Sequence, residues 1–460
     1  MKVGFGKAVI TPPVGFSLVG YFNDRRSTGI RDELYAISCV IEDKGDIFAI
    51  TSVDLIWLDE QQVKRVRHTV NKNTGIPHSN ILIHATHTHT GPIPDNAGRG
   101  IYKRGFYVEP SYLELLPFYI AGSIKMAYED MSEVDIGAGI DRVEGIAFNR
   151  RYLIKDGRVI TNPWDRVEDI VEVAGPVDDT LAVVKVEDKK TGKIKGIILN
   201  FALHPDTLGD TLISADWPGM LRAKIKEEFH NADVLVLNGP SGDINHINPE
   251  DPGRRGVEMP LSIAERLKEK TISLLEYIDM MKNPSFRIYH KKFSVPIRKV
   301  SPEQLREARG ILRSGKLPSD SLQYMVSSAL LEIAGESKRK KTLEINGCSF
   351  GNKLIILGLP GEIFTAIGMK IKELLPFRYK VLAQNSNTHL GYVPSEEAFL
   401  QDEKNMEIRP GYGTQSLVEA IGIDCSYETS PLACSVDKTA AKVFLSAVKA
   451  LMGNKGRLKW

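Results

Sequence analysis

Several stretches of this chain are nearly unbroken runs of isoleucine, leucine and valine, and each run ends in a turn that holds polar or small residues. Such runs are typical of central β-strands that are buried on both faces. We predict strands over six ranges: Asp46–Asp54, Asn80–His89, Lys195–His204, Asp233–Asn238, Lys353–Leu359 and Lys380–Gln384.

Segments with apolar residues at helical spacing lie between these runs. The clearest begins just after a Pro-Gly-Glu turn, and the predicted helices are Leu113–Tyr128, Met220–Phe229, Leu261–Tyr277, Ile363–Leu375 and Leu417–Ile421. The alternation of strands and helices predicts an α/β protein with mixed β-sheets flanked by helices. Ligands of open α/β sheets gather outside the carboxyl ends of the strands, so we expect the polar residues there to converge.

The length of 460 residues allows two or three domains or one large one. The polar stretch Pro302–Lys341 is helix-like and ends in a run of basic residues. We interpret it as a helical insertion near residues 300–342. The prediction is one large catalytic domain that spans residues 1–460.

The amino-acid composition reduces the number of functional classes that the protein could belong to. The formal net charge is only +2, from 60 basic and 58 acidic residues, so we expect no nucleic-acid partner and no anionic membrane surface. No run of about 18 apolar residues is present, which argues against a transmembrane segment. The first residues do not resemble a signal peptide, so the expected location is cytoplasmic. The four cysteines are scattered, which fits neither a cysteine zinc site nor a disulfide framework.

The segment Ile81–Pro92, with the sequence ILIHATHTHTGP, holds the main candidate chemistry. Side chains two apart on a strand point the same way, so His87 and His89 would project together from the end of the strand. Imidazole is the commonest metal ligand and also a proton carrier near neutral pH. Taken alone, these histidines could equally be polar residues of an ordinary loop.

Four further residues stand where strands meet turns. His204 ends an apolar run before Pro205, Glu362 opens an apolar helix after a Pro-Gly pair, and Arg150 and Tyr392 lie in short polar segments. Each has an ordinary structural interpretation by itself; for example, a carboxylate in the first turn of a helix is stabilised by the helix dipole.

Together these segments resemble the neutral/alkaline (non-lysosomal) ceramidase family, in the same order along the chain. The family's THTHSGP, NxFAxHP, PGE and Tyr-Val-Thr-Thr-x-Glu-Glu segments are similar to Thr86–Pro92, Asn200–Pro205, Pro360–Glu362 and Tyr392–Glu397. Weaker matches are Asn149-Arg150 and Gly242-Asp243.

The resemblance implies a hydrolase that uses a metal-activated water to cleave the amide bond of a small-molecule or lipid N-acyl substrate. It implies a zinc ion (Zn2+) bound by His87, His204, Glu362 and Tyr392. His89 and Arg150 would lie on the substrate side, where Tyr392 could also help to hold the carbonyl oxygen. Two histidines and a carboxylate with an open position are a recognised catalytic zinc set.

The resemblance has gaps. The family's second tyrosine has no counterpart close to Tyr392, and Tyr412 is the nearest later candidate. We expect no C-terminal immunoglobulin-like domain, because too few residues follow Tyr412. A metallo-esterase, a sugar deacetylase and a non-catalytic metal-containing binding protein therefore remain alternatives.

Two loops suggest supporting roles. Asp243 or Asn245, in a Gly-Asp turn, could orient a ligand histidine, and a simple tight turn is an equally good interpretation. Asp216 could cap a helix and place Trp217 on a pocket wall.

Overall fold

The structure is a computed structural model that describes residues 1–21, 23–94, 106–163, 166–251, 256–318, 321–408 and 426–453. Its core is a nine-stranded mixed sheet with the strand order β16-β14-β13-β8-β1-β5-β6-β7, and β18 pairs with β8. These strands are β1 (Lys2–Val9), β5 (Tyr35–Asp43), β6 (Asp46–Val53), β7 (Ile81–Ala85), β8 (Ser132–Arg142), β13 (Thr180–Asp188), β14 (Ile194–Phe201), β16 (Asp233–Asn238) and β18 (Met280–Met281).

A second sheet has four strands in the order β19-β20-β21-β23. They are β19 (Phe286–Pro296), β20 (Lys340–Phe350), β21 (Leu354–Gly358) and β23 (Tyr379–Ala383). One apolar cluster joins the two sheets, because it contains Leu82 and Leu237 of the first sheet together with Ile356 and Val381 of the second. The two sheets therefore pack face to face.

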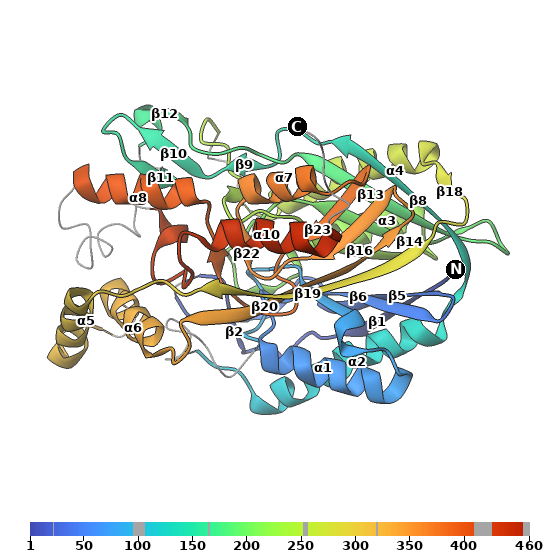
Figure 1. Ribbon diagram of the computed structural model, residues 1–460, viewed down its shortest axis with the longest axis horizontal. Helices are drawn as coiled ribbons and strands as arrows, with labels where there is room; N and C mark the ends of the chain where they lie inside the picture. Colours follow the sequence, from blue (N-terminus) through green and yellow to red (C-terminus); the bar gives the residue numbers. More distant parts are fainter. Residues whose placement is uncertain are drawn as a thin grey trace.

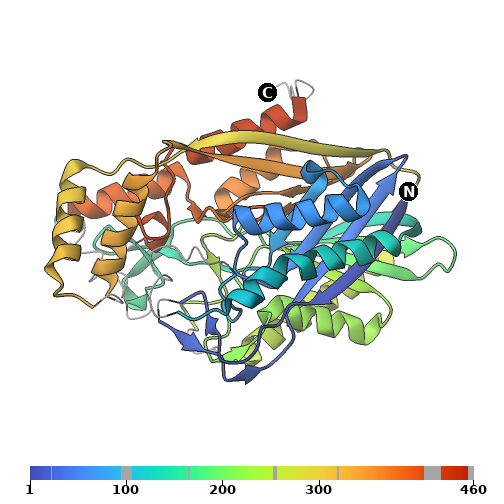
Figure 2. The same ribbon diagram turned by 90° about the horizontal axis from the view of Figure 1, so that it is seen from below.

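Helices cover the outer faces of both sheets. Against the first sheet pack α1 (Glu60–Thr74), α2 (Pro110–Glu129), α3 (Asp216–Glu228) and α4 (Glu258–Tyr277), and against the second pack α7 (Thr365–Leu374) and α10 (Ala440–Met452). Figure 1 shows α1 and α2 on one side of the strands and α7 and α10 on the other, and Figure 2 shows α1 and α2 lying across the first sheet. The predicted α/β fold with flanking helices is confirmed.

The burial pattern explains the unbroken apolar runs. In β7, Ile81, Ile83 and Ala85 belong to the cluster under the helices, whereas Leu82 belongs to the cluster between the sheets. Alternate side chains thus enter two different cores, and both must be apolar. All six predicted strands are present, with ends that differ by a few residues.

The runs singled out in the sequence are also the parallel pairs of the fold. β6 pairs with β7, β14 with β16, and β21 with β23, each in parallel register. Parallel neighbours end at the same edge of a sheet, so the residues that follow β7, β14 and β21 reach one region. This arrangement positions the site described below.

The stretch predicted as a helical insertion forms a pair of helices, α5 (Pro302–Ser314) and α6 (Leu322–Gly335), and the segment then enters β20. The two helices project at one end of the molecule in both views (Figures 1 and 2). Four of the five predicted helices match α2, α3, α4 and α7, and Leu417–Ile421 lies outside the described residues. Within the described ranges, no helix is both long and apolar enough to cross a membrane.

Short strands and helices complete the fold. The strands are β2 (Ser17–Leu18), β3 (Arg25–Arg26), β4 (Gly29–Ile30), β9 (Phe148–Asn149), β10 (Arg151–Ile154), β11 (Val159–Thr161), β12 (Ile170–Val173), β15 (Leu212–Ile213), β17 (Ile244–Asn245), β22 (Glu362–Ile363) and β24 (Tyr392–Val393). The remaining helices are η1 (His78–Asn80), η3 (Val167–Asp169), α8 (Glu396–Ile408) and η4 (Tyr427–Thr429).

Candidate metal centre

His87 and His89 lie in a tight loop after β7 and not on the strand itself. The strand ends at Ala85, and His87 has a φ of +76°, so the prediction that strand alternation aligns the two side chains is wrong. The loop is held by its backbone instead: the His87 N–H donates to the Leu55 carbonyl at 2.9 Å and the His89 N–H to the Pro205 carbonyl at 3.1 Å. The two rings still lie close, with centroids 5.0 Å apart.

Glu362 and Tyr392 are brought together by a short parallel strand pair. Glu362 lies in β22 and is the register partner of Tyr392 in β24. The expectation that Glu362 opens a helix is therefore wrong, because α7 begins only at Thr365. Glu362 has extended backbone, and Gly361 before it has a φ of +89°, which few side chains tolerate. The Pro-Gly-Glu motif is thus a turn that leads into this strand pair.

Two backbone carbonyls orient the imidazoles of His87 and His204. Nδ1 of His87 lies 2.7 Å from the Ile56 carbonyl oxygen, and Nδ1 of His204 lies 3.0 Å from that of Ser241. A carbonyl oxygen only accepts hydrogen bonds, so each Nδ1 carries a hydrogen. In the neutral ring, Nε2 then keeps its lone pair. Both side chains are thereby prepared to bind a cation through Nε2.

The donor atoms have the spacing of a single coordination shell. The two Nε2 atoms are 3.1 Å apart, and Oε2 of Glu362 is 3.2 Å from His87 and 3.6 Å from His204. The Tyr392 hydroxyl is 3.5 Å from His204 Nε2. Ligands about 2.0–2.1 Å from one tetrahedral zinc ion lie about 3.3 Å from each other. The residues present therefore fit a zinc ion.

The carboxylate of Glu362 and the lone pairs beside it make a positive charge between these donors favourable. Glu362 Oε2 is buried and accepts no hydrogen bond. Burial alone would lower the pKa of the neighbouring His87, but Glu362 outweighs that effect and raises it. Burial alone would raise the pKa of Glu362, but His87, His204 and Tyr392 together outweigh that effect and the pKa lies below its usual range. Burial, with Arg150 and His87 adding to it, lowers the pKa of His204 to about 4. A carboxylate and a neutral imidazole are the forms that bind a metal ion.

His89 is the third histidine of the group. Its ring centroid lies 5.4 Å from that of His204, and His87, His89 and His204 each offer a ligand atom within 4.8 Å of the others, so this group could hold a metal ion. Both ring nitrogens of His89 are buried and make no hydrogen bond. Burial, together with His87, lowers the pKa of His89 well below its ordinary value. His89 is thus a neutral imidazole whose two nitrogens are not engaged by the protein.

Arg150 reaches the same centre from the turn between β9 and β10. Its Nη2 donates to the Tyr392 hydroxyl at 3.0 Å and to the Gly242 carbonyl at 2.8 Å. Burial alone would lower the pKa of Arg150, but Tyr392 and Glu428 outweigh it and raise the pKa well above the ordinary value. Arg150 is therefore a buried cation directed at the Tyr392 hydroxyl.

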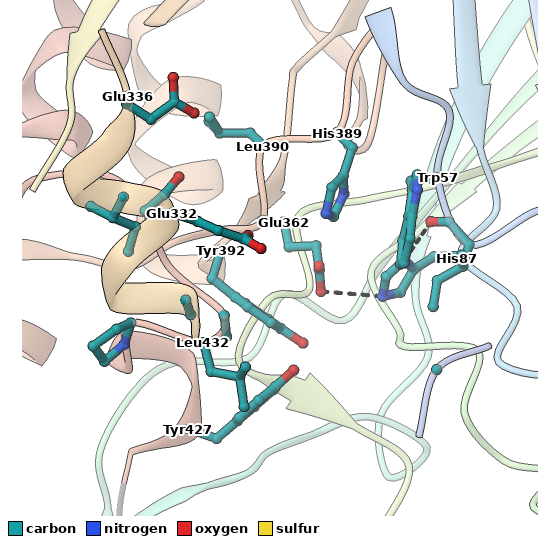
Figure 3. Close-up of a pocket in the computed structure, with 18 of the residues that line it drawn as sticks. Trp57, His87, Glu332, Glu336, Glu362, His389, Leu390, Tyr392, Tyr427 and Leu432 are labelled. Carbon is teal, nitrogen blue, oxygen red and sulfur yellow. Dashed lines mark hydrogen bonds and ion pairs between the residues drawn. The ribbon is translucent and has the colours of Figure 1, made fainter. Parts of the chain in front are cut away.

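A pocket of about 590 Å³ opens onto this centre. His87, His89, Glu362 and Tyr392 form its polar end. The rest of the lining combines the apolar residues Ile56, Ala329, Ile333, Leu390 and Leu432 with the carboxylates of Glu332 and Glu336, and the stacked Trp57 and His389 rings have centroids 4.3 Å apart. Figure 3 shows His87, Glu362 and Tyr392 facing one another, with helix α6 across the pocket. A ligand can thus approach the donor atoms from the side of α6.

Two predictions about supporting residues are wrong. Asp243 does not contact a histidine: it accepts hydrogen bonds from the Thr365 backbone at 2.7 Å and from Asn149 Nδ2 at 2.8 Å, and so links α7 to β9. Asn245 donates to Asn162. Backbone carbonyls, which carry no mark in the sequence, orient the histidines instead.

Trp217 is the other error, because it is fully buried under α3 and does not line the pocket. The neighbouring Asp216 has a φ of +57° and is itself the first residue of α3, where it accepts hydrogen bonds from Thr207 and Trp217. Trp57 lines the pocket.

The structure also adds residues that sequence reasoning missed. Tyr427 lines the pocket, and its ring centroid lies 5.5 Å from that of Tyr392. Glu428, next to it, is fully buried against Arg150. No local pattern marks either residue, and the hydrogen-bond partners of Glu428 lie more than 260 positions away. Tyr412, the candidate named from the sequence, lies outside the described residues.

Comparison with known proteins identifies the family and the fold. The family model of neutral/alkaline non-lysosomal ceramidase, N-terminal, matches residues 1–240, which include His87, His89, Arg150 and His204. Two solved structures have a similar fold. Neutral ceramidase from Pseudomonas aeruginosa is 17% identical with a TM-score of 0.71, and the match covers 98% of this chain and 74% of that chain. A ceramidase complexed with C2 is also 17% identical, with a TM-score of 0.70 and coverage of 98% and 75%. The family match extends over more than half of the 460 residues, so this chain belongs to the neutral/alkaline non-lysosomal ceramidase family, a family of hydrolases that act on amide bonds.

Proposed function

We propose that this protein is a zinc-dependent hydrolase of N-acyl amide bonds and that His87, His204, Glu362 and Tyr392 hold the Zn2+ ion. The observation that carries the proposal is the cluster of two Nε2 atoms and one carboxylate oxygen, which lie 3.1 to 3.6 Å apart in a buried space. Lone pairs this close repel one another unless a cation lies between them. Zinc is favoured over magnesium because imidazole nitrogen predominates among the donors.

Glu362 is a better third ligand beside the two histidines than His89. Its Oε2 lies within 3.6 Å of both Nε2 atoms, and it brings the negative charge that offsets the ion. His89 contacts the group by ring packing and forms no hydrogen bond with it. We therefore assign His89 to the substrate side.

A bound zinc ion supplies Lewis acidity, which polarises an acyl carbonyl and lowers the pKa of a neighbouring water to around 7. Arg150 donates a hydrogen bond to the Tyr392 oxygen, so the hydroxyl hydrogen of Tyr392 is available to donate to a different acceptor. The two side chains together place positive charge where the acyl oxygen gains negative charge. His89 has two unengaged nitrogens beside the centre and can carry a proton to the leaving amine.

The pocket supports an amphiphilic N-acyl substrate, such as a lipid amide. Its volume of about 590 Å³ lies within the range of pockets that bury most of a drug-sized ligand. The donor groups stand at one end, and the lining contributed by α6 and its neighbours has an apolar wall that includes Ile333 and Leu432, with the carboxylates of Glu332 and Glu336 beside it. We infer that the amide binds at the polar end and that an acyl arm lies along the apolar wall.

Metal analysis combined with turnover tests the proposal. The purified protein should hold one zinc ion per chain, identified by its X-ray absorption edge, and should hydrolyse members of a panel of N-acyl amides and esters. His87→Ala should lose both metal and turnover. His89→Ala should keep the metal and lose about 10²- to 10⁴-fold in kcat.

The exposed His68 on α1 provides the matched control, since His68→Ala should change neither property. Full metal content and normal turnover in His87→Ala would refute the assignment. Hydrolysis of esters but no amides would instead point to a metallo-esterase with the same metal site.

A further inference from the structure

A buried acid, Glu428, lies behind the metal centre on the short helix η4. Its side chain is 0% exposed, and both carboxylate oxygens have partners. Oε1 accepts a hydrogen bond from Nε of Arg150 at 2.7 Å, and Oε2 accepts one from the Thr161 hydroxyl at 2.8 Å. A carboxylate is rarely this buried unless it is paired, so this contact is a specific one.

The contact to Arg150 controls more than the charge of the pair. The guanidinium is a rigid plane, so a hydrogen bond at Nε determines where Nη2 points. In this structure Nη2 points at the Tyr392 hydroxyl, 3.0 Å away, and at the Gly242 carbonyl. The hydroxyl lies in turn 3.5 Å from His204 Nε2. A single chain of contacts thus runs from Glu428 through Arg150 and Tyr392 to the metal centre.

Glu428 also balances the charges around the centre. Arg150 and Arg151 are both more than nine-tenths buried, and Arg151 Nε lies 4.0 Å from Glu428 Oε2. Arg151 has a further partner, because its Nη2 donates to the Ser426 hydroxyl at 2.9 Å. The only carboxylate that Arg150 contacts among the described residues is Glu428. Without it, only the Gly242 carbonyl and the Tyr392 hydroxyl, of the acceptors that the structure describes, would accept hydrogen bonds from the guanidinium of Arg150, both at Nη2.

We propose that Glu428 is a positioning residue of the hydrolytic reaction. It holds Arg150 in place, and Arg150 in turn holds the Tyr392 hydroxyl where the acyl oxygen and the metal ion would bind. This inference rests on the proposed function. Glu428 does not touch the substrate, and its effect passes entirely through Arg150. The residue lies 278 positions after Arg150 and outside the 240 residues that the family model matches.

A purely structural role for Glu428 makes different predictions, so the test compares it with a second ion pair, which is partly buried. Glu344 lies 2.5 Å from Arg67 and 2.9 Å from His290, away from the pocket. Glu344→Gln removes a paired carboxylate without touching the centre. It should lower the unfolding temperature and leave kcat within twofold of the parent protein.

Glu428→Gln keeps the shape of the side chain and removes its charge. The folded protein should bind a full complement of metal, keep KM within threefold, and lose at least tenfold in kcat, on the order of 10²-fold for a displacement of about 1 Å. If Glu428 acts only through Arg150, the double variant with Arg150→Gln should be no slower than Arg150→Gln alone. Should Glu428→Gln not fold, Glu428→Asp replaces it, because it keeps the charge but draws the carboxylate back by one methylene.

Cobalt substitution gives a readout that does not depend on turnover. The visible spectrum of bound Co2+ reports on its ligands, so Glu428→Gln should shift it in the same direction as Arg150→Gln, and Glu344→Gln should leave it unchanged. Parent-like kcat in Glu428→Gln, multiplying losses in the double variant, or an unchanged cobalt spectrum would each overturn the role of Glu428. A parent protein that binds cobalt but hydrolyses no acyl compound would refute the proposed function, and the cobalt spectra would still decide the role of Glu428.

Discussion

Gly20 offers a way to displace His89 without altering any proposed metal ligand. It has a φ of +115°, and a Cβ built at this position would lie 2.5 Å from Cγ of His89, 2.7 Å from its Cβ and 2.8 Å from Nδ1. Ordinary van der Waals contacts begin at about 3.4 Å, so in Gly20→Ala the imidazole must retreat by about 0.9 Å. The side chain has little room to do so, because it is packed between Tyr21, His87 and His204.

The size of the expected effect follows from this displacement. A shift of about 1 Å in a group that transfers a proton costs on the order of 10²-fold in rate, or about 2.7 kcal/mol of transition-state stabilisation. Gly20→Ala should therefore lower kcat by about that factor. Metal content should stay at the level of the parent protein, because His87, His204 and Glu362 do not contact Gly20. Steady-state hydrolysis of an N-acyl amide and metal analysis measure the two quantities.

Gly15 supplies the matched control in the same segment of the chain. It has a φ of +103°, but a Cβ there would meet nothing within 4 Å. Gly15→Ala carries the same kind of backbone strain, roughly 1–2 kcal/mol of lost stability, and does not push on His89. Equal kcat values for the two variants, or an unchanged kcat in Gly20→Ala, would show that the position of His89 does not limit the reaction.

Two further predictions concern the pocket wall and the pH dependence of stability. Ile333→Ala should shift the kcat/KM preference across a panel of acyl lengths toward longer acyl arms. The expected change is roughly fourfold for each additional methylene that the enlarged pocket can bury, at about 0.8 kcal/mol per methylene. Leu331→Ala, on the same helix but outside the pocket lining, should leave this preference unchanged. Burial alone would raise the pKa of Glu344, but Arg67 and His290 lower it below its ordinary value. The stability that Glu344 contributes is then complete above the unfolded-state pKa of roughly 4.3 and is lost as the pH falls through the lower folded-state pKa. In thermal unfolding, Glu344→Gln should therefore lose less stability than the parent protein between pH 7 and pH 3. Equal losses in the two proteins would contradict the pairing.

Much of the fold was predictable because burial on two faces leaves a strong local pattern. Six apolar runs were recognisable because successive side chains enter apolar cores on the two faces of the sheet. They became β6, β7, β14, β16, β21 and β23. The sequence did not predict which strands pair in parallel, since no helix was expected between β6 and β7; the parallel pairing explains why residues after separate strands meet. The expected cytoplasmic location and the single domain over residues 1–460 stay predictions.

For the candidate site too, the sequence predicted the types of side chain and the folded structure determined their arrangement. His87, His204, Glu362, Tyr392 and Arg150 were named from motifs, because a donor side chain must be of a particular type and the sequence records that type. Only the tertiary structure decided how these side chains are held. Carbonyls of Ile56 and Ser241 aim the imidazoles, the β22–β24 pair aligns the carboxylate with the phenol, and Glu428 reaches Arg150 across 278 positions. A backbone carbonyl is the same at every residue, and a contact between distant segments leaves no periodicity, so neither could be read before the chain was folded.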